Sequence, residues 1–142
     1  MTYLQLKQAV KALLIADTTI PEDEDVLLAI VRMQLHNVAM EAESINLMTR
    51  RETQRILRKA AATTWFIRVP ATPETDADTI DLEEELAYAL ANYIAASLSR
   101  NNAIKLKRDG QAYILGYNTK VYDILQDLER MDPSETEIGF VL

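Results

Sequence analysis

The sequence has no cysteine, one histidine and only three glycines in 142 residues. Because cysteine is absent, disulfides, thiolate metal sites and cysteine nucleophiles are excluded. The chain also lacks the spacings of a glycine-rich phosphate loop, a dinucleotide-binding fingerprint, a nucleophile elbow, a zinc-protease helix and an EF-hand. We therefore expect a binding or structural protein that is not an enzyme and that holds no cofactor or metal.

No apolar run approaches the roughly 18 residues that a membrane-spanning helix requires. The N-terminal segment MTYLQLKQAVKALLIAD carries lysines within its apolar pattern and has no small-residue cleavage site. This pattern is typical of an amphipathic helix rather than a signal peptide. We expect cytoplasmic synthesis, no membrane association, and one domain large enough for a proper core.

The charges are unequal and unevenly placed. With 22 acidic and 15 basic residues the net charge is −7, which argues against a domain whose main task is to neutralise nucleic-acid phosphates. Acidic residues gather at 22–25, at 74–85 and in the C-terminal tail. Basic residues gather in two groups: Arg50, Arg51, Arg55, Arg58 and Lys59, then Arg100, Lys105, Lys107 and Arg108. Such separation suits self-association through complementary patches, and ordinary solvated faces are the alternative for any single cluster.

Two helices are predicted in the first third of the chain. The first covers residues 2–16, with Thr2 and Gln5 at capping-box spacing. The second runs from about Pro21 to Glu43 and starts with a Thr19 and Glu22 capping box. Its apolar positions are numerous enough for burial on two sides. His36, which lies in this helix without partner ligands at metal spacing, is interpreted as a partly buried structural residue with no chemistry.

A third helix is predicted after an acidic entry. Apolar residues recur at three- and four-residue steps, and Asp81 with Glu84 forms a capping signature; the apolar positions are Leu82, Leu86, Leu90, Tyr93, Ile94 and Leu98. The two asparagines that follow Arg100 suggest a turn or a helix restart. A last helix then continues to about residue 131, where Asp132-Pro133 stops it. Gly110 and Gly116 each weaken this helix by about 1 kcal/mol relative to alanine and allow a kink or break. Five tyrosines are predicted to lie at the edge of the core, where the last two helices meet; they are Tyr88, Tyr93, Tyr113, Tyr117 and Tyr122.

The segment between the second and third helices leaves two interpretations open. Residues 49–62 contain good helix formers, which favours a short basic helix followed by a strand. Alternatively, RILRKAAATTWFIRVP could form a two-stranded ribbon, with AATT at its turn. Pro70 and Pro73 end the extended part or confine it to an edge. Trp65 and Phe66 would then serve either as a docking device or as a cap on the helical core.

The chain ends in PSETEIGFVL, a polar stretch followed by an apolar tetrad. An apolar terminus of this kind suits a partner groove or a sheet edge. Together, the patterns predict a mainly helical protein. Its domain covers residues 1–131, with an extended or β-hairpin arm at about 63–73 and a loose docking tail at 132–142.

The order of these parts resembles that of the small head-to-tail connector proteins, also called adaptor or head-completion proteins, of tailed bacteriophages. The resemblance covers most of the chain and is carried by WFIRVP with its prolines, the acidic DADTIDLEEE entry, ALANYIAASLSR and the tyrosine-rich last helix. It implies a bundle of four to five helices that assembles into a ring of about twelve copies beneath the portal.

In such a virion the subunit would be made in the host cytoplasm, extend the DNA channel without sequence-specific binding, and contact the portal and the tail. The resemblance makes Gly139–Leu142 a docking tail and Trp65–Val69 part of an arm between subunits or toward the tail. The interface candidates are Arg50, Arg51, Arg55, Arg58, Lys59, Trp65, Phe66, Arg68, Gly139, Phe140, Val141 and Leu142. The alternatives are a small helical regulator or DNA-binding protein that uses Arg50–Lys59 on phosphates, and a metal-assisted enzyme that uses the acidic cluster.

Overall fold

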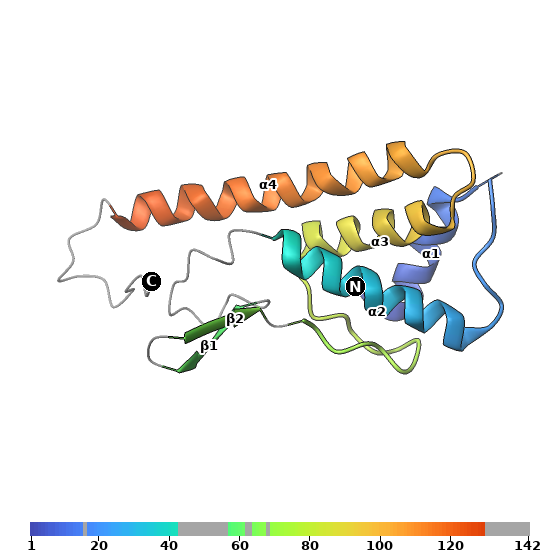
Figure 1. Ribbon diagram of the computed structural model, residues 1–142, viewed down its shortest axis with the longest axis horizontal. Coiled ribbons are helices and arrows are strands. Elements are labelled where there is room, and N and C mark those ends of the chain that lie inside the picture. The colour runs from blue at the N-terminus through green and yellow to red at the C-terminus, as the bar shows by residue number, and fades with distance from the viewer. Residues whose placement is uncertain (16, 43–56, 62–63, 68, 130–142) are drawn as a thin grey trace.

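The computed structural model describes residues 1–15, 17–42, 57–61, 64–67 and 69–129 (Figure 1). Within these residues the chain is mainly helical, as the sequence predicted. The elements in order are α1 (Tyr3–Leu13), α2 (Glu24–Glu41), β1 (Leu57–Ala61), β2 (Thr64–Ile67), α3 (Glu84–Leu98) and α4 (Ala103–Glu129).

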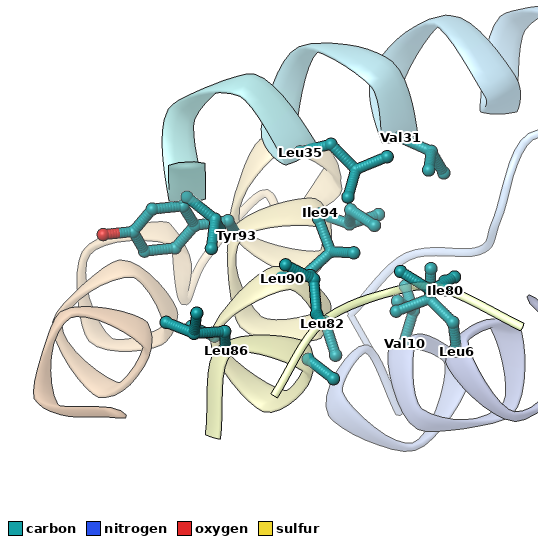
Figure 2. Packing of buried hydrophobic residues seen from close by; sticks show 14 of the residues in the cluster. Leu6, Val10, Val31, Leu35, Ile80, Leu82, Leu86, Leu90, Tyr93 and Ile94 are labelled. Carbon is teal, nitrogen blue, oxygen red and sulfur yellow. The ribbon is translucent and has the colours of Figure 1, made fainter. Parts of the chain in front are cut away.

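Helix α3 lies at the centre of the molecule, and α1, α2 and α4 all pack against it (Figure 1). Its sequence predicted one apolar face, but its buried residues lie nearly all round it, because three helices surround it; they are Leu86, Ala87, Ala89, Leu90, Ala91, Asn92, Tyr93, Ile94 and Ala95. In Figure 2, Leu90 and Ile94 lie between the leucine and valine side chains of α2 and those of α1.

Helix α1 begins as its sequence predicted. The backbone N–H of Gln5 donates to Thr2 Oγ1 at 3.2 Å, and the N–H of Thr2 donates to Gln5 Oε1 at 2.9 Å. This reciprocal pair is a capping box, which satisfies two backbone donors of the first turn.

The other two predicted capping residues are wrong. Helix α2 begins at Glu24 rather than Pro21, because the carboxylate of Asp23 accepts from the backbone N–H of Asp25 at 3.0 Å and so caps the helix further along the chain. Helix α3 begins at Glu84 after Glu83, which provides no side-chain cap. The reason is that Leu82 is drawn into the core before the helix starts, with only 3% of its surface exposed.

The acidic segment before α3 is attached to the start of α1. The backbone N–H groups of Tyr3 and Leu4 donate to the carbonyl oxygens of Asp78 and Asp76 at 2.9 and 3.1 Å. In return, the N–H of Ile80 donates to the carbonyl of Met1 at 2.9 Å. Lys7 Nζ lies 2.6 Å from the Asp76 carboxylate. This segment was predicted to be a polar connector, and it also satisfies first-turn donors of α1 that have no partner within the helix.

The turn between α3 and α4 is held by Asp17, which follows α1. Its carboxylate accepts a hydrogen bond from the Ser99 hydroxyl, from the backbone N–H of Arg100 at 3.2 Å and from Asn101 Nδ2 at 3.4 Å. These bonds hold the pKa of Asp17 below its usual value, the Ser99 bond contributing most. The predicted turn at the asparagine pair is therefore confirmed, and a residue 82 positions earlier in the chain braces it.

Helix α4 is one continuous helix through both of its glycines, so the break that they allow does not occur. Gly110 is buried against the Tyr93 ring of α3, whereas a Cβ atom added at Gly116 would meet nothing within 4 Å. The predicted pairing of tyrosines across the two helices is present at Tyr88 and Tyr113, whose ring centroids are 5.5 Å apart.

Strands β1 and β2 form an antiparallel pair in which Arg58 lies opposite Phe66 and Lys59 opposite Trp65. The helix favoured for residues 49–62 is thus wrong over residues 57–61. The physical reason is that the Thr-Trp-Phe-Ile run, which prefers extended backbone, provides a pairing partner that overrides the local helix propensity of residues 57–61. The predicted stop at Asp132-Pro133 and the tail at 132–142 lie outside the described residues.

Candidate interaction surface

Only some of the interface residues predicted from the sequence lie in the described part of the chain. Arg58 and Lys59 lie in β1, and Trp65 and Phe66 lie in β2. The remaining ones lie outside the described residues: Arg50, Arg51, Arg55, Arg68, Gly139, Phe140, Val141 and Leu142. Among the residues whose side chains are described, a different surface stands out, and it belongs to α2.

Helix α2 has apolar residues on two sides. One side is buried in the core and consists of Leu27, Val31, Leu35, Val38 and Ala39. The other side carries Val26, Met33 and Met40, which are 46%, 62% and 53% exposed. These three residues recur every seventh position, so they follow one line along the helix opposite the core. The sequence of α2 was expected to allow burial on two sides, but in the structure only one apolar side is buried and the other is exposed.

The exposed side of α2 also lacks charge. Ala29, His36 and Asn37 lie beside the three apolar residues and are exposed. The interpretation of His36 as partly buried is therefore wrong, because it lies on the side that faces away from α3. Arg32 is the one charged residue between positions 26 and 40, and it lies about a quarter turn away, where its Nε donates to Thr72 Oγ1 at 3.5 Å. We call Val26, Ala29, Met33, His36 and Met40 the outer face of α2.

A cavity of about 310 Å³ lies beside this face, between α2 and α4. Tyr93 of α3 lies at its inner end, and its hydroxyl donates to the Glu41 carboxylate. Burial, followed by this hydrogen bond, raises the pKa of Tyr93 far above its usual value, so the hydroxyl stays protonated at neutral pH. The other lining residues are Gln34, Asn37, Ala96, Ser97, Ala103, Ile104 and Lys107. The hydrogen bond between Tyr93 and Glu41 gives the buried hydroxyl a partner and links the end of α2 to α3.

Helix α4 has an outer face of a different character. Ile104 is 78% exposed and Leu115 is 67% exposed. Lys105, Lys107 and Arg108 are also exposed and lie within the first two turns of the helix. We call Ile104, Arg108 and Leu115 the outer face of α4; they lie within about 40° of one another around the helix axis.

Four consecutive acidic residues lie at the start of α2. Glu22, Asp23, Glu24 and Asp25 are all exposed, and Tyr3 donates its hydroxyl hydrogen to Glu24 Oε1 at 2.8 Å. Helices α2 and α3 both start with acidic residues, whereas α4 starts with basic ones; α2 and α4 also carry exposed apolar residues.

Within the described ranges, no group of three or more histidine, aspartate or glutamate residues is arranged to hold a metal ion. None of the helices described is both long enough and apolar enough to cross a membrane. Comparisons with models of known protein families, with curated proteins and with solved structures found no match.

Sequence reasoning did not select the outer face of α2 as an interface. The signal that could have identified it is the seven-residue spacing of Val26, Met33 and Met40 in a stretch with one charged residue. Periodicity alone does not tell which of two apolar sides the core will cover, so the choice required the packed structure.

Proposed function

We propose that this protein is a structural virion subunit of a tailed bacteriophage, without enzymatic activity or cofactor. Its copies form a ring of about twelve between the portal and the tail, where the ring extends the channel through which DNA passes. The protein belongs in the neck of the virion after its synthesis in the host cytoplasm.

The observation that carries this proposal is the uncharged, apolar outer face of α2 in a chain with a net charge of −7. Contiguous exposed apolar patches are typical of surfaces that bind other proteins, and Val26, Ala29, Met33 and Met40 lie along one side of α2. The resemblance in the order of parts, described from the sequence, adds the phage connector as the setting for such a surface.

The distribution of charge supports the same function. The basic start of α4 and the acidic start of α2 are on different helices, which suits lateral contacts between copies. An overall negative charge also suits a channel wall, since DNA slides more freely where phosphates are weakly held.

Two finer features complete the proposal. The hairpin of β1 and β2, which contains Trp65 and Phe66 and overlaps the arm expected at about 63–73, contacts a neighbouring subunit or the tail. Residues 132–142 act as the docking tail, with Gly139–Leu142 as the part that enters the portal or a neighbour. The helical domain at 1–131 then supplies the body of a ring subunit built as a bundle of four to five helices.

The test is to mix the purified protein with purified rings of the portal protein encoded near its gene. We expect a stable complex on sedimentation, and a ring of added density on the portal in electron microscopy. Deleting Gly139–Leu142 should weaken this complex while leaving the circular dichroism spectrum unchanged. The substitution Gln8→Ala, at an exposed position of α1, serves as a control that should bind normally.

Two results would contradict the proposal. Failure of the full chain to bind portal rings would remove the connector function. Tight binding to duplex DNA that weakens steeply with salt would instead favour the alternative of a small DNA-binding protein. Normal portal binding by the truncated chain would contradict the docking tail alone.

A further inference from the structure

The outer face of α2 is apolar along its length and is preceded by acidic residues, so a complementary partner is apolar along its length and basic at one end. Val26, Met33 and Met40 form the apolar line, and the exposed acids Glu22–Asp25 lie directly before it. A partner helix that matched both features would bury the apolar line and place positive charge beside the acids.

The outer face of α4 in a second copy has these properties. Lys105, Lys107 and Arg108 provide the positive charge, and Ile104 and Leu115 provide exposed apolar surface. Both helices therefore carry a charged start of opposite sign followed by apolar side chains in the same chain direction.

The spacing along the two helices agrees as well. Leu115 lies seven residues after Arg108, and Met33 lies seven residues after Val26. If the helices run parallel with Arg108 beside Val26, then Leu115 lies beside Met33, and Arg108 lies within about one helical turn of Asp25. This register aligns one apolar pair, Leu115 with Met33, and brings Arg108 near Asp25, while Ile104 falls near Glu22.

The two faces lie on neighbouring helices of one molecule, and Ile104 of the outer face of α4 lines the cavity beside the outer face of α2. Helices α2 and α4 both pack on α3 and run along different sides of it (Figure 1). One copy can therefore use α2 toward one neighbour and α4 toward another, which is a heterologous contact that can continue from copy to copy.

We propose that copies of this chain associate side by side, with the outer face of α2 of one copy packed against the outer face of α4 of the next in parallel register. This inference concerns the lateral contact of the proposed ring and so rests partly on the proposed function. It is nevertheless testable without the portal, so that failure of one proposal can be distinguished from failure of the other.

The absence of native cysteine allows a direct test by cross-linking. Two single-cysteine variants, Met33→Cys and Leu115→Cys, are made in separate chains of different size and mixed at high protein concentration with a short bismaleimide. We expect a covalent heterodimer in this mixture. The matched control mixes Leu115→Cys with Gln8→Cys, at an exposed position of α1, and should give no such product.

A charge reversal tests the register. Arg108→Glu in the Leu115→Cys chain should cause a loss of heterodimer because it places an acid beside Asp25. Adding Asp25→Lys to the Met33→Cys chain should restore the product. Both sites are exposed, and circular dichroism of each variant verifies that the fold is retained.

The proposal is overturned if folded variants give no heterodimer above the control, or if Arg108→Glu leaves the yield unchanged. It is also overturned if Met33→Cys links to itself as efficiently as to Leu115→Cys, because that result indicates a two-fold contact between α2 helices. Cross-linking without portal binding would contradict the proposed function only, and portal binding without cross-linking would contradict the lateral contact only.

Discussion

Gly110 of α4 lies so close to Tyr93 of α3 that a Cβ atom added at residue 110 would be 2.5 Å from Tyr93 Cε1. The missing side chain is therefore what lets α4 approach α3 at this point. The Tyr93 ring cannot move freely to make room, because it is 4% exposed and its hydroxyl donates to Glu41.

We expect Gly110→Ala to lower the free energy of unfolding by about 1–2 kcal/mol, because the cost of overpacking, about 1–3 kcal/mol, outweighs the gain in helix propensity. Gly116→Ala is the matched control, because nothing lies within 4 Å of its added Cβ, and it should raise the free energy of unfolding by about 0.5–1 kcal/mol. Urea unfolding followed by circular dichroism measures both. Equal effects at the two glycines would show that the contact with Tyr93 does not constrain the packing.

The connector before α3 contributes to the core as well as to the surface. Ile80 is 1% exposed, and Ile104 is 78% exposed. We expect Ile80→Ala to lower the free energy of unfolding by about 2–4 kcal/mol through lost burial and a residual cavity. Ile104→Ala removes the same atoms from a solvated position and should change it by less than about 0.5 kcal/mol. Similar losses for both variants in denaturant unfolding would contradict the burial of this segment.

Acid should weaken the turn that Asp17 holds. The pKa of Asp17 is lowered in the folded protein, mainly by the hydrogen bond from Ser99, so its contribution to stability is present above the unfolded pKa of about 3.9 and is lost as the pH falls through the lower folded value. We expect Asp17→Asn to be less stable than the wild type at neutral pH and to lose less stability on acidification. The exposed Glu22→Gln is the control. Thermal unfolding between about pH 6 and 2 gives the comparison, and parallel pH curves for the wild type and Asp17→Asn would refute the prediction.

High pH should destabilise the folded protein because it favours ionisation of the buried tyrosines. Burial, together with hydrogen bonds to Glu24 and Glu41, raises the pKa of Tyr3 and of Tyr93 in the folded protein. Because the unfolded chain releases these protons near pH 10, stability is complete below that pH and falls above it. In an absorbance titration we expect Tyr3 and Tyr93 to ionise only as the protein unfolds. The Tyr3→Phe and Tyr93→Phe variants should each reduce this late step, and ionisation of all six tyrosines in one early step would contradict the burial.

The chain's local signals determined much of the fold. The helical class, the capping box at Thr2 and Gln5, the turn after Arg100 and the choice of the third helix as the main core helix were all predicted. These features depend on periodicity, caps and turn residues within a few positions of one another, and their energies are largely local.

Contacts between distant segments decided the rest. Helix α2 is capped by Asp23 and not by the predicted Thr19. Asp17 holds a turn that lies 82 positions further along the chain, and residues 57–61 pair as a strand. The side of α2 that stays exposed could not be read from the sequence, because both sides carry apolar residues and only the position of α3 selects between them. The candidate interface therefore follows from tertiary packing, which covers one apolar side of a helix and leaves the other in water.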